Sequence, residues 1–261
     1  MAKPIISSAI VESERRGRVA ILRLNRPDKR NAVNDALMGD IERVFDALTE
    51  RDRAVVICGN GEHFCAGLDL AEHKDRAPFD VVRHSRYWHQ VTDKIQFGGR
   101  PVLAAMQGAV VGGGLEIAAA AHVRVADETA FYQLPEGRRG IFVGGGASVR
   151  VAGIVGVSRV VEMMLTGRRY DAAEGERLGL SHYLVPPGEA FARAMELAEQ
   201  IAGNAAMSNY MILNALAHIG EAPGQSGLFA ESLAAALTQT TEDARKGIET
   251  FLEKRGAEFE E

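Results

Sequence analysis

The chain has 261 residues, 46% of them hydrophobic and 25% charged, which are the proportions of an ordinary globular protein. That length supports one large domain, or one domain with a small appendage. The net charge of −5 comes without a basic stripe, so binding to nucleic acids or to anionic membranes is disfavoured.

Cysteine usage and the first residues favour a cytoplasmic protein. Cys58 and Cys65 are too close in sequence for a disulfide bond between them to stabilise a fold, and this cysteine usage fits a reducing compartment. The segment Met1 to Pro4 lacks the apolar core of a signal peptide. Residues 101–123 are long enough to span a bilayer, but Gln107, Glu116 and several glycines interrupt them, so no membrane span is expected.

The first part of the chain predicts short strands that end in glycine-bearing loops. Residues 9–12 and 18–24 favour a hairpin that turns at Arg16-Gly17. Residues 33–51 place apolar side chains on one helical face, with Asn34 as the expected N-cap. Apolar runs at residues 54–58 and 102–106 are typical of buried strands.

Strands and helices continue to alternate before the pattern becomes purely helical. Strands are predicted at residues 123–126, 130–133 and 181–185, and helices at 158–165 and 171–178. From Glu189 onward the chain is alanine-rich and helical, with a loop at residues 222–227. These patterns predict an α/β domain over residues 1–187 and a helical region over residues 188–261.

The segment from Gly108 to Glu116 is the first candidate for chemistry. Gly112, Gly113 and Gly114 let the backbone approach a ligand and leave its N–H groups unobstructed. Good helix formers follow, so these amides are expected at the positive end of a helix, where an oxyanion is stabilised. Glu116 is then a lone carboxylate in an apolar segment, and burying it is costly unless it is paired, hydrogen-bonded or protonated.

A second loop, residues 61–70, follows the predicted strand at 54–58. If this strand and the strand at 102–106 are neighbours in a parallel sheet, both loops leave the same edge, where ligands usually bind. Ala66 and Gly67 would then present backbone N–H groups toward Gly113. Two amides that converge on one oxygen are what the stabilisation of an enolate requires.

Glu136 is the second candidate carboxylate. A helix, a strand, a turn and a strand separate it from Glu116, and this route can return the chain to the same pocket. Two acids beside an oxyanion hole can hold a water, one taking a proton and the other giving one. The alternatives are a helix cap or an arginine partner for Glu116, a solvated loop carboxylate for Glu136, and glycines that only permit close packing. We favour catalysis.

The sequence contains no motif for a metal site, a serine nucleophile or a phosphate-binding loop. The seven histidines form no metal-ligand spacing, so no metal is expected. Ser148 has no recognisable base, and no Gly-Lys-Ser/Thr follows the glycines as in a phosphate loop. Cys65 is expected to be a small buried hydrophobe rather than a nucleophile.

Five motifs together resemble the enoyl-CoA hydratase/isomerase (crotonase) superfamily. They are Asn25-Arg26-Pro27 with Asn31-Ala32, Phe64 to Leu70, Gly108 to Glu116, Leu165 to Arg168, and Phe251 to Arg255. The resemblance covers nearly the whole chain. It implies a spiral of ββα units and a C-terminal helical trimerisation region, assembled as a homotrimer or homohexamer. It also implies an acyl-CoA substrate whose carbonyl is held by the amides of Ala66 and Gly113, with no cofactor besides coenzyme A.

The resemblance also implies a reaction. Hydratases of this superfamily carry both acids, here Glu116 to orient and deprotonate water and Glu136 to protonate C2. This favours hydration of a 2-enoyl-CoA, or the reverse dehydration. Isomerisation, carnitinyl-CoA-type dehydration, a phenylpropenoyl-CoA (feruloyl-CoA) hydratase-lyase reaction and a catalytically idle relative remain alternatives. Substrate and CoA contacts are expected from Lys29, Arg30, Ala32, Gly67, Leu68, Asp69, Gly112 and Lys254.

The chain departs from the superfamily pattern near the expected acyl pocket. Arg138 and Arg139 stand where relatives are apolar, and His122 stands where an aspartate is common. The region of residues 83–91, which often lines the acyl pocket in the superfamily, includes Tyr87, Trp88 and His89. Aliphatic and aromatic acyl groups both remain open on this basis.

Overall fold

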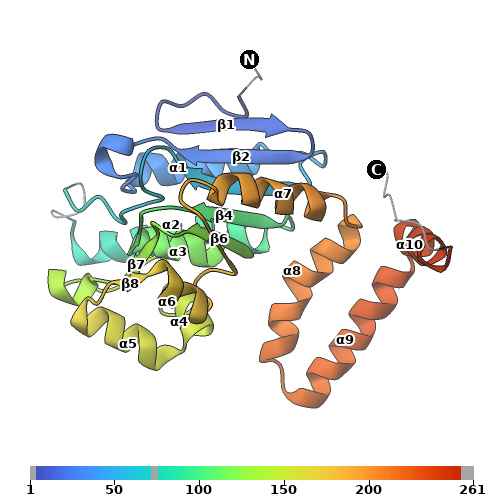
Figure 1. Ribbon diagram of the computed structural model, residues 1–261. Helices are drawn as coiled ribbons and strands as arrows, with labels where there is room; N and C mark the ends of the chain where they lie inside the picture. Colours follow the sequence, from blue (N-terminus) through green and yellow to red (C-terminus); the bar gives the residue numbers. More distant parts are fainter. Residues whose placement is uncertain (1–3, 72–75, 254–261) are drawn as a thin grey trace.

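The computed structural model describes residues 4–71 and 76–253, and a six-stranded sheet forms its centre (Figure 1). The strands β1 and β2 pair as an antiparallel hairpin that turns at Gly17, and the remaining neighbours are parallel. The sheet order is β1 (Val11–Arg16), β2 (Val19–Leu24), β3 (Ala54–Gly59), β4 (Val102–Met106), β6 (Val123–Asp127) and β9 (Tyr183–Val185). The hairpin and the parallel pairing of β3 with β4 are confirmed.

A second, three-stranded sheet carries the chain toward the site. It consists of β5 (Ala109–Val111), β7 (Phe131–Gln133) and β8 (Tyr170–Asp171), with β5 parallel to β7. The strands predicted at 123–126 and 130–133 therefore belong to different sheets. Asp127 turns the chain between them, because its Oδ1 accepts hydrogen bonds from the amide and the hydroxyl of Thr129. Strand β5 was expected only as a loop.

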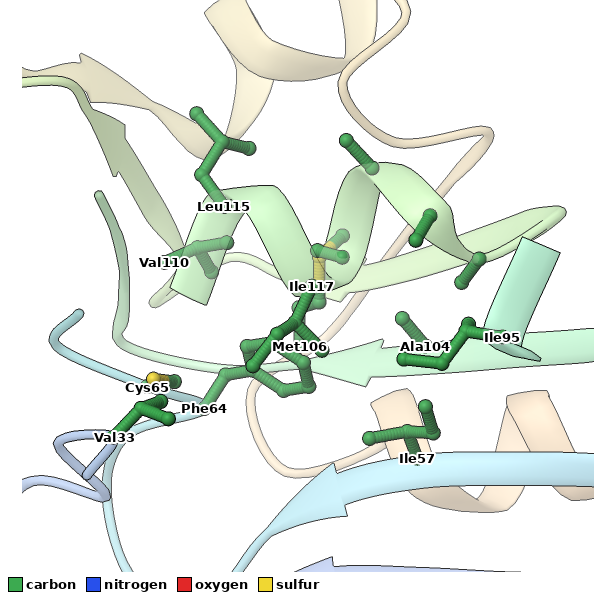
Figure 2. Packing of buried hydrophobic residues seen from close by; sticks show 14 of the residues in the cluster. Val33, Ile57, Phe64, Cys65, Ile95, Ala104, Met106, Val110, Leu115 and Ile117 are labelled. Atoms are coloured by element: carbon green, nitrogen blue, oxygen red, sulfur yellow. The ribbon is translucent and has the colours of Figure 1, made fainter. Parts of the chain in front are cut away.

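The large sheet is buried on both faces, which explains its near-continuous apolar strands. The helices α1 (Asp35–Asp46), α2 (Pro78–Phe97) and α3 (Gly113–Ala120) cover one face, and α7 (Ala190–Ala202) covers the other. Successive residues of β3 point to opposite faces of the sheet. Val55 and Ile57 pack in the core under α1, α2 and α3, and Val56 packs in the core under α7. Figure 2 shows Ile57 together with Met106 and Ile117 in the core between the sheet and α3.

Local signals explain where these helices begin. The side chain of Asn34 accepts a hydrogen bond from the amide of Leu37, which confirms the predicted cap, although α1 ends earlier than expected. Helix α2 was not predicted, nor was α4 (Arg150–Val155). The short helices besides α4 are η1 (Pro27–Lys29), η2 (Glu136–Arg139), α5 (Val157–Thr166) and α6 (Ala172–Arg177).

Three C-terminal helices project from this body in Figure 1, namely α8 (Ala206–Glu221), α9 (Gly224–Gln239) and α10 (Glu242–Leu252). Helix α7 precedes them and packs on the sheet, so the part that projects begins after α7. The division into residues 1–187 and 188–261 stays a prediction. In the part of the chain that is described, no helix is both long and apolar enough to cross a bilayer.

Arg124 joins the end of α3 to the segment before β9. Its guanidinium is buried and donates to the carbonyl oxygens of Ala121, Gly179 and Leu180 at 2.8, 3.2 and 2.9 Å. No acidic partner neutralises it among the described residues, and burial lowers the pKa of Arg124 to about 10. This side chain therefore fixes the helix that carries Glu116.

Arg124→Met should lower the free energy of unfolding by roughly 2–4 kcal/mol, because three buried carbonyls lose their charged donor. Urea denaturation followed by circular dichroism measures this change. Arg43→Met removes only an exposed pair with Asp40 and should change the free energy by about 0.5 kcal/mol or less. Equal denaturation midpoints for the two variants would contradict this role of Arg124.

Candidate active site

The loop after β3 lies directly against β5. Cys65 pairs with Val110 in a parallel bridge, with hydrogen bonds from Cys65 N to Ala109 O (2.8 Å) and from Val111 N to Cys65 O (3.1 Å). This pairing brings Gly67 to the start of α3. A Cβ on Gly67 would lie 2.7 Å from Val111 O and 3.3 Å from Gly113 N, so only glycine fits without displacement.

Neither Gly113 nor Gly114 has room for a side chain, and a different neighbour blocks each position. A Cβ on Gly113 would lie 2.8 Å from two ring atoms of Trp88, and one on Gly114 would lie 2.3 Å from Cys65 O. These glycines therefore permit close packing against Trp88 and Cys65, and the approach of their backbone to a ligand stays a prediction. Gly113 is the first residue of α3, where an N–H group has no acceptor within the helix.

The amide that faces Gly113 is that of Leu68, not that of Ala66. The prediction of a free Ala66 amide is wrong, because Ala66 N donates to Arg30 O at 2.9 Å. The amide of Val33 donates to Gly67 O (2.7 Å), and the carbonyl of Val33 accepts from Asp69 N (2.8 Å). Leu68 lies between these two bonded residues, so its N–H points to the side opposite Val33. A Cβ on Gly113 would lie 3.5 Å from Leu68 N. Neither amide has an acceptor within the described residues.

Glu116 projects from the first turn of α3 into the protein. It is 4% exposed, and its Oε1 accepts hydrogen bonds from the amides of Gly145 (2.8 Å) and Ala147 (3.0 Å). Burial raises the pKa of Glu116, and these amides and the charge of Arg150 oppose that rise. The side chain neither caps its own helix nor forms an ion pair within the described residues, so the two alternative roles do not apply.

Glu136 reaches the same place because β5 and β7 are parallel. Their carboxyl ends are adjacent, where Gly112 N donates to Gln133 O at 2.9 Å. A Cβ on Gly112 would lie 2.8 Å from Glu136 Oε1, and Oε2 is buried without a hydrogen-bond partner in the described part of the chain. Burial first, and then the charge of Glu116, raise the pKa of Glu136 to about 7, although a hydrogen bond from its own backbone and the charge of Arg139 oppose the rise.

Two contributions to the site were not predicted from the sequence. They are the amide of Leu68 as the partner of Gly113, and the loop amides of Gly145 and Ala147. A signal for the loop exists in the sequence, since Gly144, Gly145 and Gly146 form a second glycine run. The amide of Leu68 has no such signal.

The residues expected to contact the substrate lie around the loop that carries Leu68. Lys29 and Arg30 are exposed beside it, and Arg26 pairs with Asp69 at 3.1 Å while its Nη1 donates to Ala32 O at 2.5 Å. Lys254 lies outside the described residues.

Over residues 4–71 and 76–253, no group of three or more histidine, cysteine or acidic residues could hold a metal ion.

Comparisons with known proteins agree on one family. Residues 14–261 match the family model of enoyl-CoA hydratase/isomerase. The enoyl-CoA hydratase EchA19 of Mycobacterium tuberculosis is 30% identical over 95% of both chains, and the 2,3-dehydroadipyl-CoA hydratase of Escherichia coli is 33% identical over 94% of this chain and 96% of its own. A solved structure from Rhodopseudomonas palustris CGA009 is 48% identical, with a TM-score of 0.93 over 97% of this chain and 98% of its own. The chain belongs to the enoyl-CoA hydratase/isomerase family and has the crotonase fold.

Proposed function

We propose that this protein is an enoyl-CoA hydratase, which adds water across the C2=C3 bond of a 2-enoyl-CoA thioester or catalyses the reverse reaction. The observation that carries the proposal is the arrangement of two buried carboxylates, Glu116 and Glu136, around two amides that have no acceptor among the described residues. The names of the relatives from M. tuberculosis and E. coli, both called hydratases, support it.

The amides of Leu68 and Gly113 form the oxyanion hole in this proposal. As a hydroxyl group adds at C3, negative charge develops on the thioester oxygen, and two N–H donors stabilise it. One such donor is typically worth roughly 3–4 kcal/mol in the transition state. The positive end of the α3 dipole adds to the same effect because Gly113 is the first residue of that helix.

The two glutamates divide the proton transfers. Glu116 Oε1 is occupied by two amides, so Oε2 is the atom that accepts a proton from the attacking water. Glu136, with its pKa of about 7, keeps its proton over part of the neutral range and delivers it to C2. Water is added without electron transfer, so no cofactor besides coenzyme A is needed.

The remaining expectations belong to the same proposal. The backbone around Gly67, Asp69, Ala32 and Gly112 borders the thioester, while Lys29 and Arg30, together with Lys254, provide positive charge for the phosphates of coenzyme A. Two of these cations are exposed beside the loop of Leu68. A cytoplasmic location stays a prediction from the sequence.

We further propose that the protein assembles as a homotrimer or a homohexamer through its C-terminal helices. Helix α9 presents Phe229, Leu233 and Leu237 at spacings of four residues, and these side chains are 67%, 57% and 48% exposed. Isolated soluble chains rarely expose a contiguous apolar stripe of this kind. The helices α8 to α10 project from the body, which leaves this stripe open to a second copy.

Replacing either glutamate should abolish most of the activity. We expect Glu116→Gln and Glu136→Gln to lower kcat about 10²–10⁴-fold on crotonyl-CoA, because each removes a proton-transfer group while KM changes little. The loss of ultraviolet absorbance of the conjugated thioester measures the rate. Glu128→Gln, which changes an exposed glutamate outside the site, is the matched control and should keep the wild-type rate.

Product analysis distinguishes hydration from the other reactions of this fold. A 3-hydroxyacyl-CoA product supports the proposal. A shifted double bond without water uptake would indicate an isomerase, and release of an aromatic aldehyde would indicate a hydratase-lyase. Wild-type rates in both glutamine variants across a panel of enoyl-CoAs would overturn the assignment.

Glu136 should also make the stability of the protein depend on pH. Its pKa is about 7 in the folded protein against an ordinary 4.5, so between these values the folded state holds a proton that the unfolded chain has released. The contribution of Glu136 to stability therefore falls as the pH rises through this window. Glu136→Gln should be more stable than the wild type at pH 8 by roughly 1–3 kcal/mol, and nearly equal to it at about pH 4.5. Urea denaturation at both pH values tests this, and a pH-independent difference would contradict it.

The assembly can be tested with one substitution on α9. Leu233→Glu places a charge in the exposed apolar stripe, and we expect it to shift the protein from a trimer or hexamer to a monomer in sedimentation velocity experiments. Glu231→Ala changes an exposed polar position on the same helix and should leave the assembly intact. A monomeric wild-type protein at micromolar concentration would contradict the proposed assembly.

A further inference from the structure

The short helix η2 carries Glu136 at its start and Arg139 at its end, and the two side chains share one face. The hydrogen bonds of η2 are those of a 3₁₀ helix, as in the bond from Arg138 N to Pro135 O at 3.1 Å. Such a helix completes a turn every three residues, so the side chains of residues i and i+3 lie one above the other. Arg139 therefore stands one turn beyond Glu136 in the same direction.

The other two faces of η2 pack against the end of α5. Gly137 lies against that helix, because a Cβ on it would be 2.5 Å from Met164 O. The aliphatic part of Arg138 occupies the space that a side chain on Gly167, just after α5, would need. The third face is therefore the one that α5 leaves to the active site.

On this third face an exposed cation follows a buried acid. Glu136 is 6% exposed, and its Oε2 has no hydrogen-bond partner among the described residues, whereas Arg139 is exposed. The guanidinium of Arg139 forms no ion pair or hydrogen bond within residues 4–71 and 76–253. Burial raises the pKa of Glu136 to about 7, the charge of Glu116 adds to this rise, and the charge of Arg139 opposes it.

The charged groups of α5 and of the segment after it are engaged with other neighbours. Their contacts are Arg159 with Glu162, Arg168 with Glu174, and Arg169 with the ring of Phe131. Across the site, the charge of Arg150 acts on Glu116. The charges that act on Glu136 are therefore those of Glu116 and Arg139.

We propose that Arg139 is a positioning residue for proton transfer, whose guanidinium stabilises the carboxylate that Glu136 becomes when it protonates C2. This inference rests on the proposed hydratase function and deepens it. In each hydration Glu116 takes one proton from water and Glu136 gives one to C2, so the negative charge passes from the first carboxylate to the second. Loss of a proton by Glu116 and uptake of one by Glu136 then restore the starting state. A cation beside Glu136 favours the step in which the charge arrives there.

The pH profile of kcat/KM on crotonyl-CoA tests this role. Hydration needs protonated Glu136, so the rate falls as the pH rises through the pKa of that residue. Arg139→Gln removes the cation and so raises this pKa, and we expect the alkaline limb of the profile to move up by about half to one pH unit. Arg139→Lys keeps the charge and should keep the wild-type limb. Arg138→Gln, which changes the other exposed arginine of η2, is the matched control and should not move the limb.

A second measurement does not depend on turnover. Urea denaturation of Arg139→Gln, Glu136→Gln and the double variant, at equal protein concentration, gives the coupling between the two side chains. Only the ionised form of Glu136 is stabilised by the cation, so we expect a coupling of about 2–6-fold in the unfolding equilibrium at pH 8. At pH 4.5 the folded state holds Glu136 protonated, and the coupling should disappear.

The outcomes separate this inference from the function on which it rests. If the wild type hydrates no enoyl-CoA, the proposed function fails, whatever the denaturation shows. If the wild type is active, the function stands, and the role of Arg139 is overturned by any of three results. These are an unmoved alkaline limb in Arg139→Gln, an equal movement in Arg138→Gln, and a coupling to Glu136 that is absent or the same at both pH values. A purely structural role of Arg139 would change stability at both pH values without moving the limb.

Discussion

The close approach of two backbone segments is the constraint on which the site depends. The loop after β3 reaches the first turn of α3 only because Gly67, Gly113 and Gly114 have no side chains, and any Cβ there would meet backbone or ring atoms. The pairing of Cys65 with β5 holds the loop in this register. The N–H groups of Leu68 and Gly113 are left without acceptors in the described chain, and this makes the place suited to developing negative charge.

The two carboxylates are placed by different parts of the fold, and this gives them different chemistry. Glu116 sits on α3, and two amides of the loop at residues 145–147 support its charged form. Glu136 follows β7 and keeps a buried oxygen without a partner in the described chain. The small second sheet is what brings them together, because parallel β5 and β7 end side by side. A charge on one disfavours a charge on the other, which suits a pair that exchanges protons in opposite directions.

Sequence patterns predicted the pairing of β3 with β4 and the importance of the glycine segment, because buried strands and consecutive glycines leave strong local signals. The choice of Ala66 over Leu68 failed because the direction of an amide depends on the bridge to Val33, which is a long-range contact. Helix α2 was missed although Trp88, Val91, Thr92 and Ile95 follow helical spacing, since the exposed polar residues between them weaken the pattern. The split of the strands around Asp127 into two sheets likewise depends on tertiary structure.

One arginine joins helix α2 to the loop that supports the carboxylate of Glu116. Arg150 binds Thr92, which bonds the carbonyl of Trp88, and it also contacts the carbonyl of Gly145, whose amide holds Glu116. Arg150 further bonds Asp93 and Gln96 on α2, so several hydrogen bonds join helix α2 to the loop at residues 145–147. The position of the Glu116 carboxylate therefore depends on contacts that α2 makes, as well as on α3, which carries it.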